Sequence, residues 1–133
     1  DLPRDFRLGV FADYKFWNPT DIDWEKLPVA DRPMVVVKKP PFSGETWTHV
    51  AFTFENYNAA DKNTAAKSTL YLNGQSSGSL IKPMQFHWDK ENTAIMLGLL
   101  YIGDFDDLAV FSKALTPAEI QHLYQLPGGA SDL

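Results

Sequence analysis

Three acidic residues lie close together near the end of the chain, at Asp104, Asp106 and Asp107. Carboxylate oxygens suit Ca²⁺, which takes about six to eight oxygen ligands, some of them from backbone carbonyls. The cluster therefore predicts a calcium site. The alternative is that Asp106 or Asp107 accepts hydrogen bonds from neighbouring backbone N–H groups and stabilises a turn, as short carboxylates do. The sequence leaves both interpretations open.

Two stretches combine aromatic rings with carboxylate and amide side chains. An indole stacks on the apolar C–H face of a sugar, and nearby Asp and Asn side chains bond its hydroxyl groups. The predicted ligand-binding residues are Tyr14, Trp17, Asn18, Asp21, Asp23 and Trp24, together with His87, Trp88 and Asp89. The alternative is that these rings point inward and anchor their loops, which is the preferred interpretation for Trp47.

The three histidines do not form a recognisable metal motif. His49, His87 and His122 show no HxH or HExxH spacing, and the chain has no cysteine to join them. A zinc site is therefore not predicted from spacing.

Composition limits the classes of partner. The chain has 133 residues, enough for one domain with one core, and a formal net charge of −5 without a run of Lys or Arg. Nucleic acid and anionic membrane surfaces are excluded as partners because both require clustered positive charge. The longest apolar run, residues 94–102, contains Gly98 and is too short to cross a bilayer.

The acidic cluster lies in a segment that reads as a strand. Residues 105–111 alternate and are apolar on most of both faces, which predicts a central strand covered on each side. Thr116 to Glu119 then reads as a capping box with Pro117 at the first helical position. A short amphipathic helix is expected to start there and to end before Pro127.

The rest of the chain reads as short strands separated by turns. Asn73-Gly74 predicts a type I′ hairpin, and Val50, Phe52 and Phe54 are expected on a core face. Residues 14–32 show no periodicity and are predicted to form a long loop ordered by its aromatic rings. Seven to nine strands are expected, at residues that include 6–12, 34–38, 47–55, 68–73, 75–81, 94–97 and 105–111. The predicted fold class is all-β, a jelly-roll-like antiparallel β-sandwich with one short C-terminal helix.

Two segments resemble a known family. The order Gly103, Phe105-Asp106-Asp107-Leu108, Val110-Phe111, Lys113-Ala114-Leu115-Thr116, Glu119-Ile120 resembles the closing segment of laminin-G-like, concanavalin A-like jelly-roll domains. Trp47-Thr48-His49-Val50-Ala51 and Thr69-Leu70-Tyr71-Leu72-Asn73-Gly74 resemble two paired strands of the same family. The resemblance covers roughly residues 45 to 125.

The resemblance implies a non-catalytic module that binds a glycan or glycoprotein, as part of a larger extracellular, periplasmic or cell-surface protein. In related carbohydrate-binding domains an Asp of the final strand helps to hold calcium, and Asp106 or Asp107 resembles it. One competing function is a structural accessory domain beside an enzyme. A glycan-active hydrolase or lyase is disfavoured because the E-x-D-x-E run of catalytic relatives is missing.

The family also implies an incomplete domain. Its members carry several strands before the point at which this chain begins, so residues 1–133 are expected to be a single domain that lacks its N-terminal strands. Sheet edges left open in this way tend to pair with other chains. We therefore expect either a homodimer or a further segment of the same protein to cover them.

Overall fold

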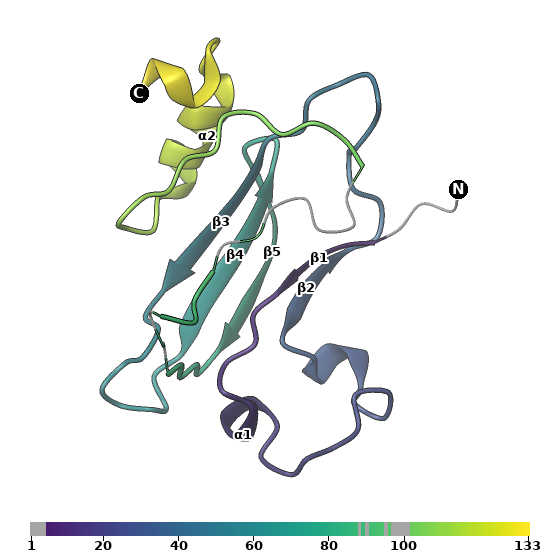
Figure 1. Ribbon diagram of the computed structural model, residues 1–133, viewed down its shortest axis with the longest axis vertical. Coiled ribbons are helices and arrows are strands. Elements are labelled where there is room, and N and C mark those ends of the chain that lie inside the picture. The colour runs from purple at the N-terminus through teal and green to yellow at the C-terminus, as the bar shows by residue number, and fades with distance from the viewer. Residues whose placement is uncertain (1–4, 88, 90, 95, 97–101) are drawn as a thin grey trace.

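The computed structural model describes residues 5–87, 89, 91–94, 96 and 102–133, and its strands form two antiparallel sheets (Figure 1). In the first, β1 (Phe6–Gly9) pairs with β2 (Met34–Val37). In the second, β4 (Ala66–Leu72) lies between β3 (Val50–Glu55) and β5 (Gln75–Lys82). The prediction of an all-β antiparallel fold is confirmed.

The helical elements are short, and they lie outside the sheets. They are α1 (Tyr14–Trp17), the 3₁₀ helix η1 (Val29–Asp31), α2 (Pro117–Gln125) and the 3₁₀ helix η2 (Gly129–Asp132). In the described part of the chain, no helix has the length and hydrophobicity needed to span a membrane.

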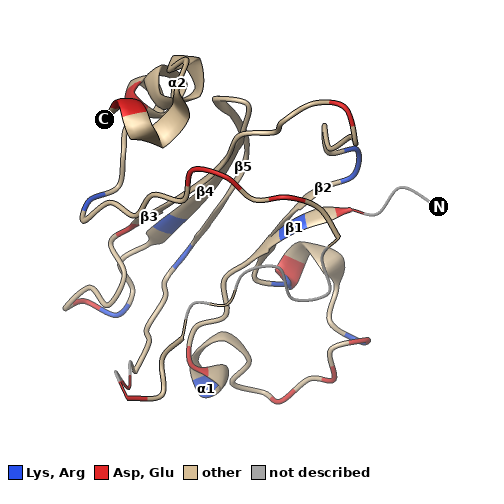
Figure 2. Cartoon of the chain, turned by 45° about the horizontal axis from the view of Figure 1, so that its top comes forward, with Lys and Arg blue, Asp and Glu red and all other residues tan. Residues whose placement is uncertain are grey.

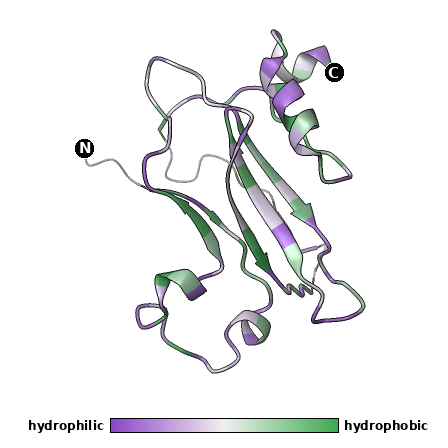
Figure 3. Cartoon of the chain, turned by 180° about the vertical axis from the view of Figure 1, so that it is seen from behind, coloured by the Kyte–Doolittle hydropathy of each residue, from purple (hydrophilic) through white to green (hydrophobic). Residues whose placement is uncertain are grey.

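The two sheets pack together at a close approach between β2 and β5. Gly78 has a φ of +136°, and a Cβ placed on it would lie 2.6 Å from Val35 Cγ1, so the absence of a side chain lets Val35 rest on the β5 backbone. Figure 3 shows β2 coloured as hydrophobic along its length. The buried core residues are Leu8, Val10, Ala12, Val35, Ala66, Leu70, Leu72, Leu80 and Met84.

Local sequence signals at the hairpin and the last helix are confirmed. Asn73 and Gly74 have φ values of +49° and +75°, as a type I′ turn requires. Thr116 Oγ1 accepts the N–H of Glu119 at 3.2 Å, while the Glu119 carboxylate accepts the N–H of Thr116 at 2.7 Å. α2 is thereby capped, and it buries Ile120 against the body of the domain.

The prediction of a central strand at residues 105–111 is wrong. This segment forms no strand, and Leu108 and Val110 are 69% and 79% exposed. Asp107 has a φ of +54°, which interrupts an extended backbone. Alternation favours a strand only where another strand pairs with it, and none of the strands in the described part of the chain does so. In Figure 1 the segment runs past the upper end of the three-stranded sheet before it enters α2.

Three further side chains differ from expectation. Phe52 and Phe54 were expected in the core but are 44% and 47% exposed, on β3, which is the outer strand of its sheet among the strands that the structure describes. Trp47 was expected to point inward but is 69% exposed, in the loop before β3. The structure describes five of the seven to nine expected strands, and the predicted strand at 94–97 falls partly on residues that it does not describe.

Candidate functional site

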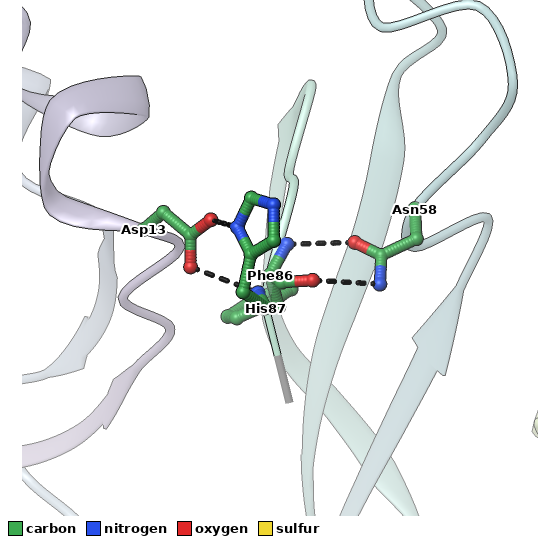
Figure 4. A network of polar contacts seen from close by, with 4 residues as sticks. All are labelled: Asp13, Asn58, Phe86 and His87. Carbon is green, nitrogen blue, oxygen red and sulfur yellow. Dashed lines mark hydrogen bonds and ion pairs between the residues drawn. The ribbon is translucent and has the colours of Figure 1, made fainter. Parts of the chain in front are cut away.

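The two stretches that carry the predicted ligand-binding residues meet at Asp13. Its carboxylate accepts the backbone N–H of His87 at 2.9 Å and contacts His87 Nδ1 (Figure 4). The backbone of Gln85 adds a further bond, from the Asp13 N–H at 2.9 Å. The hydrogen bond from the His87 backbone is the main cause that lowers the pKa of Asp13 below its ordinary value, so the carboxylate stays charged.

Residues 84–87 form the strip that follows β5, and the β3–β4 loop holds the side of this strip opposite Asp13. The Asn58 side chain accepts the N–H of Phe86 at 2.7 Å and donates to its carbonyl at 3.0 Å, an arrangement that Figure 4 shows beside the Asp13 contact. Residues 84–87 therefore join the α1 region to the β3–β4 loop. These are two of the segments that border the pocket described below.

Four aromatic rings pack together around α1. The ring centroids of Phe11 and Trp17 lie 5.6 Å apart, those of Tyr14 and Trp17 5.5 Å apart, and those of Trp17 and Trp24 6.3 Å apart. These edge-to-face contacts are favourable for aromatic pairs. They confirm the prediction that the rings order this long loop.

Asn18 fixes the backbone of the same loop. Its side chain is buried, donates to the Ile22 carbonyl at 2.9 Å and to Tyr14 Oη at 3.1 Å, and accepts the Ile22 N–H at 3.1 Å. The Tyr14 hydroxyl in turn donates to the Asp21 carboxylate, which is the main cause that raises the pKa of Tyr14. These polar groups bond each other, so they stabilise the loop.

Arg32 closes the loop from its far end. Its guanidinium lies 4.6 Å from the centre of the Trp24 ring and donates to the carbonyls of Trp24 at 3.1 Å and Leu27 at 3.2 Å. This is a cation–π contact with two hydrogen bonds, a combination that suits the planar guanidinium. One face of Trp24 is therefore occupied, although the side chain is still 38% exposed.

An open pocket of about 380 Å³ lies beside this aromatic cluster. Its volume is within the range of about 300–1,000 Å³ that is common for small-molecule sites. Four separate segments contribute: α1, the η1–β2 region, the β3–β4 loop and the end of β5. The residues that line it are Phe16, Trp17, Asp31, Pro33, Lys62, Asn63, Lys82 and Pro83.

The structure gathers only some of the predicted ligand-binding residues at this place. Tyr14, Trp17, Asn18, Asp21 and Trp24 come together, and Trp17 is the one that lines the pocket. Asp23 forms an exposed ion pair with Lys26 at 2.7 Å. The Asp89 carboxylate accepts the N–H of Glu91 at 3.0 Å and closes its own turn. Trp88 lies outside the described residues.

Sequence reasoning missed the pocket's polar residues. Lys62 and Asn63 lie in a loop whose small polar residues indicate only a surface position, and Lys82 ends a strand. Nothing in their local pattern sets them apart, because the pocket forms only when distant segments meet.

The predicted calcium ligands do not come together. Figure 2 shows the acidic positions spread along the segment that leads into α2. In the described part of the chain, which includes Asp104, Asp106 and Asp107, no three acidic or histidine side chains are grouped closely enough to hold a metal ion. Asp106 Oδ1 instead accepts the N–H of Asp107 at 2.9 Å, the turn contact of the alternative interpretation. The side chains as placed do not fit calcium, which stays a prediction from the sequence.

Comparison with known proteins adds three findings. A search of curated proteins gave no significant match. Among solved structures, the chain is similar to the crystal structure of an S-layer domain-containing protein (residues 221–444) from Clostridium thermocellum, with 20% sequence identity and a TM-score of 0.47. That similarity covers 71% of this chain, which spans 46% of the other chain.

The third finding concerns the family. Residues 6–121 match the laminin-G family that is described as the concanavalin A-like lectin/glucanases superfamily. This match spans most of the chain, including both sheets and the start of α2. Its description names lectins, which bind sugars, and glucanases, which cleave them. The chain therefore belongs to the concanavalin A-like lectin/glucanase superfamily.

Proposed function

We propose that this domain is a non-catalytic carbohydrate-binding module and that its ligand binds in the pocket beside Trp17. The observation that carries the proposal is the composition of that pocket. Trp17, Phe16 and two prolines provide apolar surface for the C–H face of a sugar, and Asn63 and the lysines provide polar groups for its hydroxyls.

The pocket also favours binding over cleavage. A glycoside hydrolase requires two carboxyl groups on either side of the scissile bond, about 5–9.5 Å apart. Of the residues that line the pocket, all of them in the described part of the chain, only Asp31 is acidic. A hydrolase acting here would lack its second carboxylate.

A structural accessory domain is the second candidate function. The observation that favours it is the mutual packing of Trp17, Trp24 and Phe11, because rings that contact each other also serve simply to hold a loop. Under that function the pocket would have no ligand. The proposed carbohydrate-binding function includes two further expectations: the partner is a glycan or glycoprotein, and the protein is located outside the cytoplasm.

A glycan array followed by calorimetry with the best ligand tests the proposal. Asn63→Ala removes an exposed pocket side chain, and we expect it to weaken binding about two- to tenfold through a lost hydrogen bond, without unfolding the domain. Trp17→Ala is expected to weaken it further. Trp47→Ala is the matched control, because this exposed Trp precedes β3 at the end of the sheet away from the β3–β4 loop.

The outcome decides between the two functions. Binding that the pocket variants weaken and Trp47→Ala does not would support the module. No binding anywhere on the array, with and without calcium, would overturn the proposal in favour of the accessory domain. A thermal shift on adding CaCl₂ that Asp106→Asn abolishes would support the calcium prediction separately.

A further inference from the structure

The pocket carries an excess of positive charge although the chain as a whole is negative. Lys62 and Lys82 line it with one carboxylate, Asp31, whereas the chain has a formal net charge of −5. Lysines that line a concave surface attract anions to it, because the low-dielectric walls concentrate their field. The charge of the pocket is therefore opposite to that of the rest of the protein.

In the part of the chain that the structure describes, no carboxylate forms an ion pair with either lysine. Among the described residues, the ion pairs involve Arg7, Lys26, Lys38, His87 and Lys113, and they include neither Lys62 nor Lys82. Lys82 Nζ donates to the backbone carbonyl of Asp31 at 3.2 Å, which leaves its other two N–H groups for a ligand. Each lysine therefore has N–H groups left to donate to an anionic ligand.

The backbone around the lysines is held in place. The Asp61 carboxylate accepts the N–H of Asn63 at 2.9 Å, and the Asp61 carbonyl accepts the N–H of Thr64 at 2.9 Å, so Lys62 sits in a defined turn. The Gln85 side chain bonds the Ala59 carbonyl at 3.2 Å and ties this loop to the strip at 84–87. Pro83 follows Lys82 and restricts its backbone to extended conformations. A binding site whose parts are held in this way loses less entropy when a ligand binds.

We propose that the pocket recognises an acidic sugar, with the anionic group bound by Lys62 and Lys82 and the sugar ring against Trp17. This inference rests on the proposed function and adds to it the class of ligand. The anionic group is a carboxylate or a sulfate, since an ammonium binds either one as a point charge. Neutral sugars of the same size would leave both ammonium groups without an anionic partner.

Matched pairs of oligosaccharides test the class of ligand. Uronic-acid oligosaccharides are compared with their methyl esters, and sulfated oligosaccharides with their desulfated forms, by calorimetry on the full chain. We expect the acidic member of at least one pair to bind about tenfold tighter or more, since bonds between charged groups are the stronger ones. The preference should decrease as salt is added, because salt screens exposed charges.

Variants then locate the anionic group. Lys62→Gln and Lys82→Gln are each expected to reduce the ratio of the affinities for the acidic and the neutral member about tenfold. Lys82→Arg should retain the preference, and Asp31→Asn should strengthen it by removing the negative charge of Asp31 from the pocket. Lys39→Gln is the matched control, because Lys39 is exposed and follows the end of β2 that points away from η1.

Each result has a distinct meaning. Loss of the preference in both pocket variants, with the control unchanged, would support the inference. Equal binding of acidic and neutral members would overturn the inference and leave the proposed function standing, as would a preference that survives both Lys→Gln changes. No binding of any member would overturn the proposed function, and the inference with it.

Discussion

The carboxylate of Asp13 accepts a hydrogen bond from the backbone N–H of His87 and contacts Nδ1 of the same residue's imidazole, although the two residues lie 74 positions apart in the sequence. Through this contact the loop that follows β1 is fixed to the strip that follows β5. The sequence presents these as two separate aromatic stretches. The contact makes them neighbours, and it places the strip between the α1 region and the β3–β4 loop.

Replacing Asp13 by Asn should destabilise the domain at neutral pH but not in acid. The pKa of Asp13 is lowered on folding, so its contribution to stability is present above the ordinary value of 3.8 and is lost as the pH falls through the lowered value. Thermal melts should show a lower Tm for Asp13→Asn at neutral pH, a difference that starts to shrink below pH 3.8, and convergence with the natural chain only once the pH has fallen below the lowered pKa. Asp23→Asn, which breaks an exposed ion pair, should change Tm little. A constant difference at all pH values would contradict this role for the charge.

Gly78 should not tolerate a side chain. Its φ of +136° and the 2.6 Å approach to Val35 Cγ1 mean that an added Cβ both strains the backbone and pushes the sheets apart. Gly78→Ala is therefore expected to lower the free energy of unfolding by about 1–3 kcal/mol, measured by denaturant titration. At Gly44, where an added Cβ would meet no atom within 4 Å, the same change should stay within about 1 kcal/mol. Equal effects at the two glycines would show that the close approach is not what Gly78 provides.

The parts of the fold that follow from local rules could be predicted. Asn73-Gly74 sets a turn through its own backbone preferences, and Thr116 caps α2 through a contact three residues away. The strand predicted at residues 105–111 failed because alternation does not say whether a partner strand is present. The family itself could be recognised from short motifs, which the match over residues 6–121 confirms.

The candidate site could be predicted only in part. Trp17 stands out by residue type, so sequence reasoning found it. Lys62 and Lys82 become candidate ligand contacts only because four segments form a pocket that both residues line. A lysine in a loop or at the end of a strand does not by itself indicate a pocket. Conversely, Asn18 and Asp21 have the residue types of sugar ligands, yet the structure uses them to bond Tyr14 and the loop backbone.

Acid should weaken α2 through Glu119. The pKa of Glu119 is lowered from 4.5 to about 2. The largest cause is the hydrogen bond from Lys113 Nζ at 2.8 Å, and the bonds from Thr116 come next. The stabilisation is fully present above pH 4.5 and is lost as the pH falls towards 2. Melts of Glu119→Gln should lie below those of the natural chain at neutral pH and merge with them near pH 2. Glu45→Gln, at an exposed position outside the helices, is the control and should follow the natural chain throughout.

Arg32→Lys should loosen the aromatic loop although it keeps the charge. The planar guanidinium of Arg32 stacks on the Trp24 ring and at the same time donates to the carbonyls of Trp24 and Leu27. The ammonium of a lysine is not planar, so it cannot make all three contacts at once. We expect a loss of about 1–2 kcal/mol in the free energy of unfolding. Tryptophan fluorescence should change at the same time, and Arg7→Lys, which alters an exposed ion pair, should leave both readings close to those of the natural chain. Unchanged fluorescence in Arg32→Lys would show that the guanidinium does not hold Trp24.

The open side of β3 should make the chain associate with a second copy. Among the described strands, β3 lies at the edge of its sheet and exposes Phe52 and Phe54, and an apolar edge of this kind pairs readily with another chain. Sedimentation velocity over a range of concentrations should reveal a dimer. Phe52→Lys should dissociate it, because a charged side chain cannot be buried in such a pairing, whereas Val29→Lys, on exposed η1, should not. A chain that sediments as a monomer at every concentration would contradict the dimer, and a further segment of the same protein would then be the partner to seek for this edge.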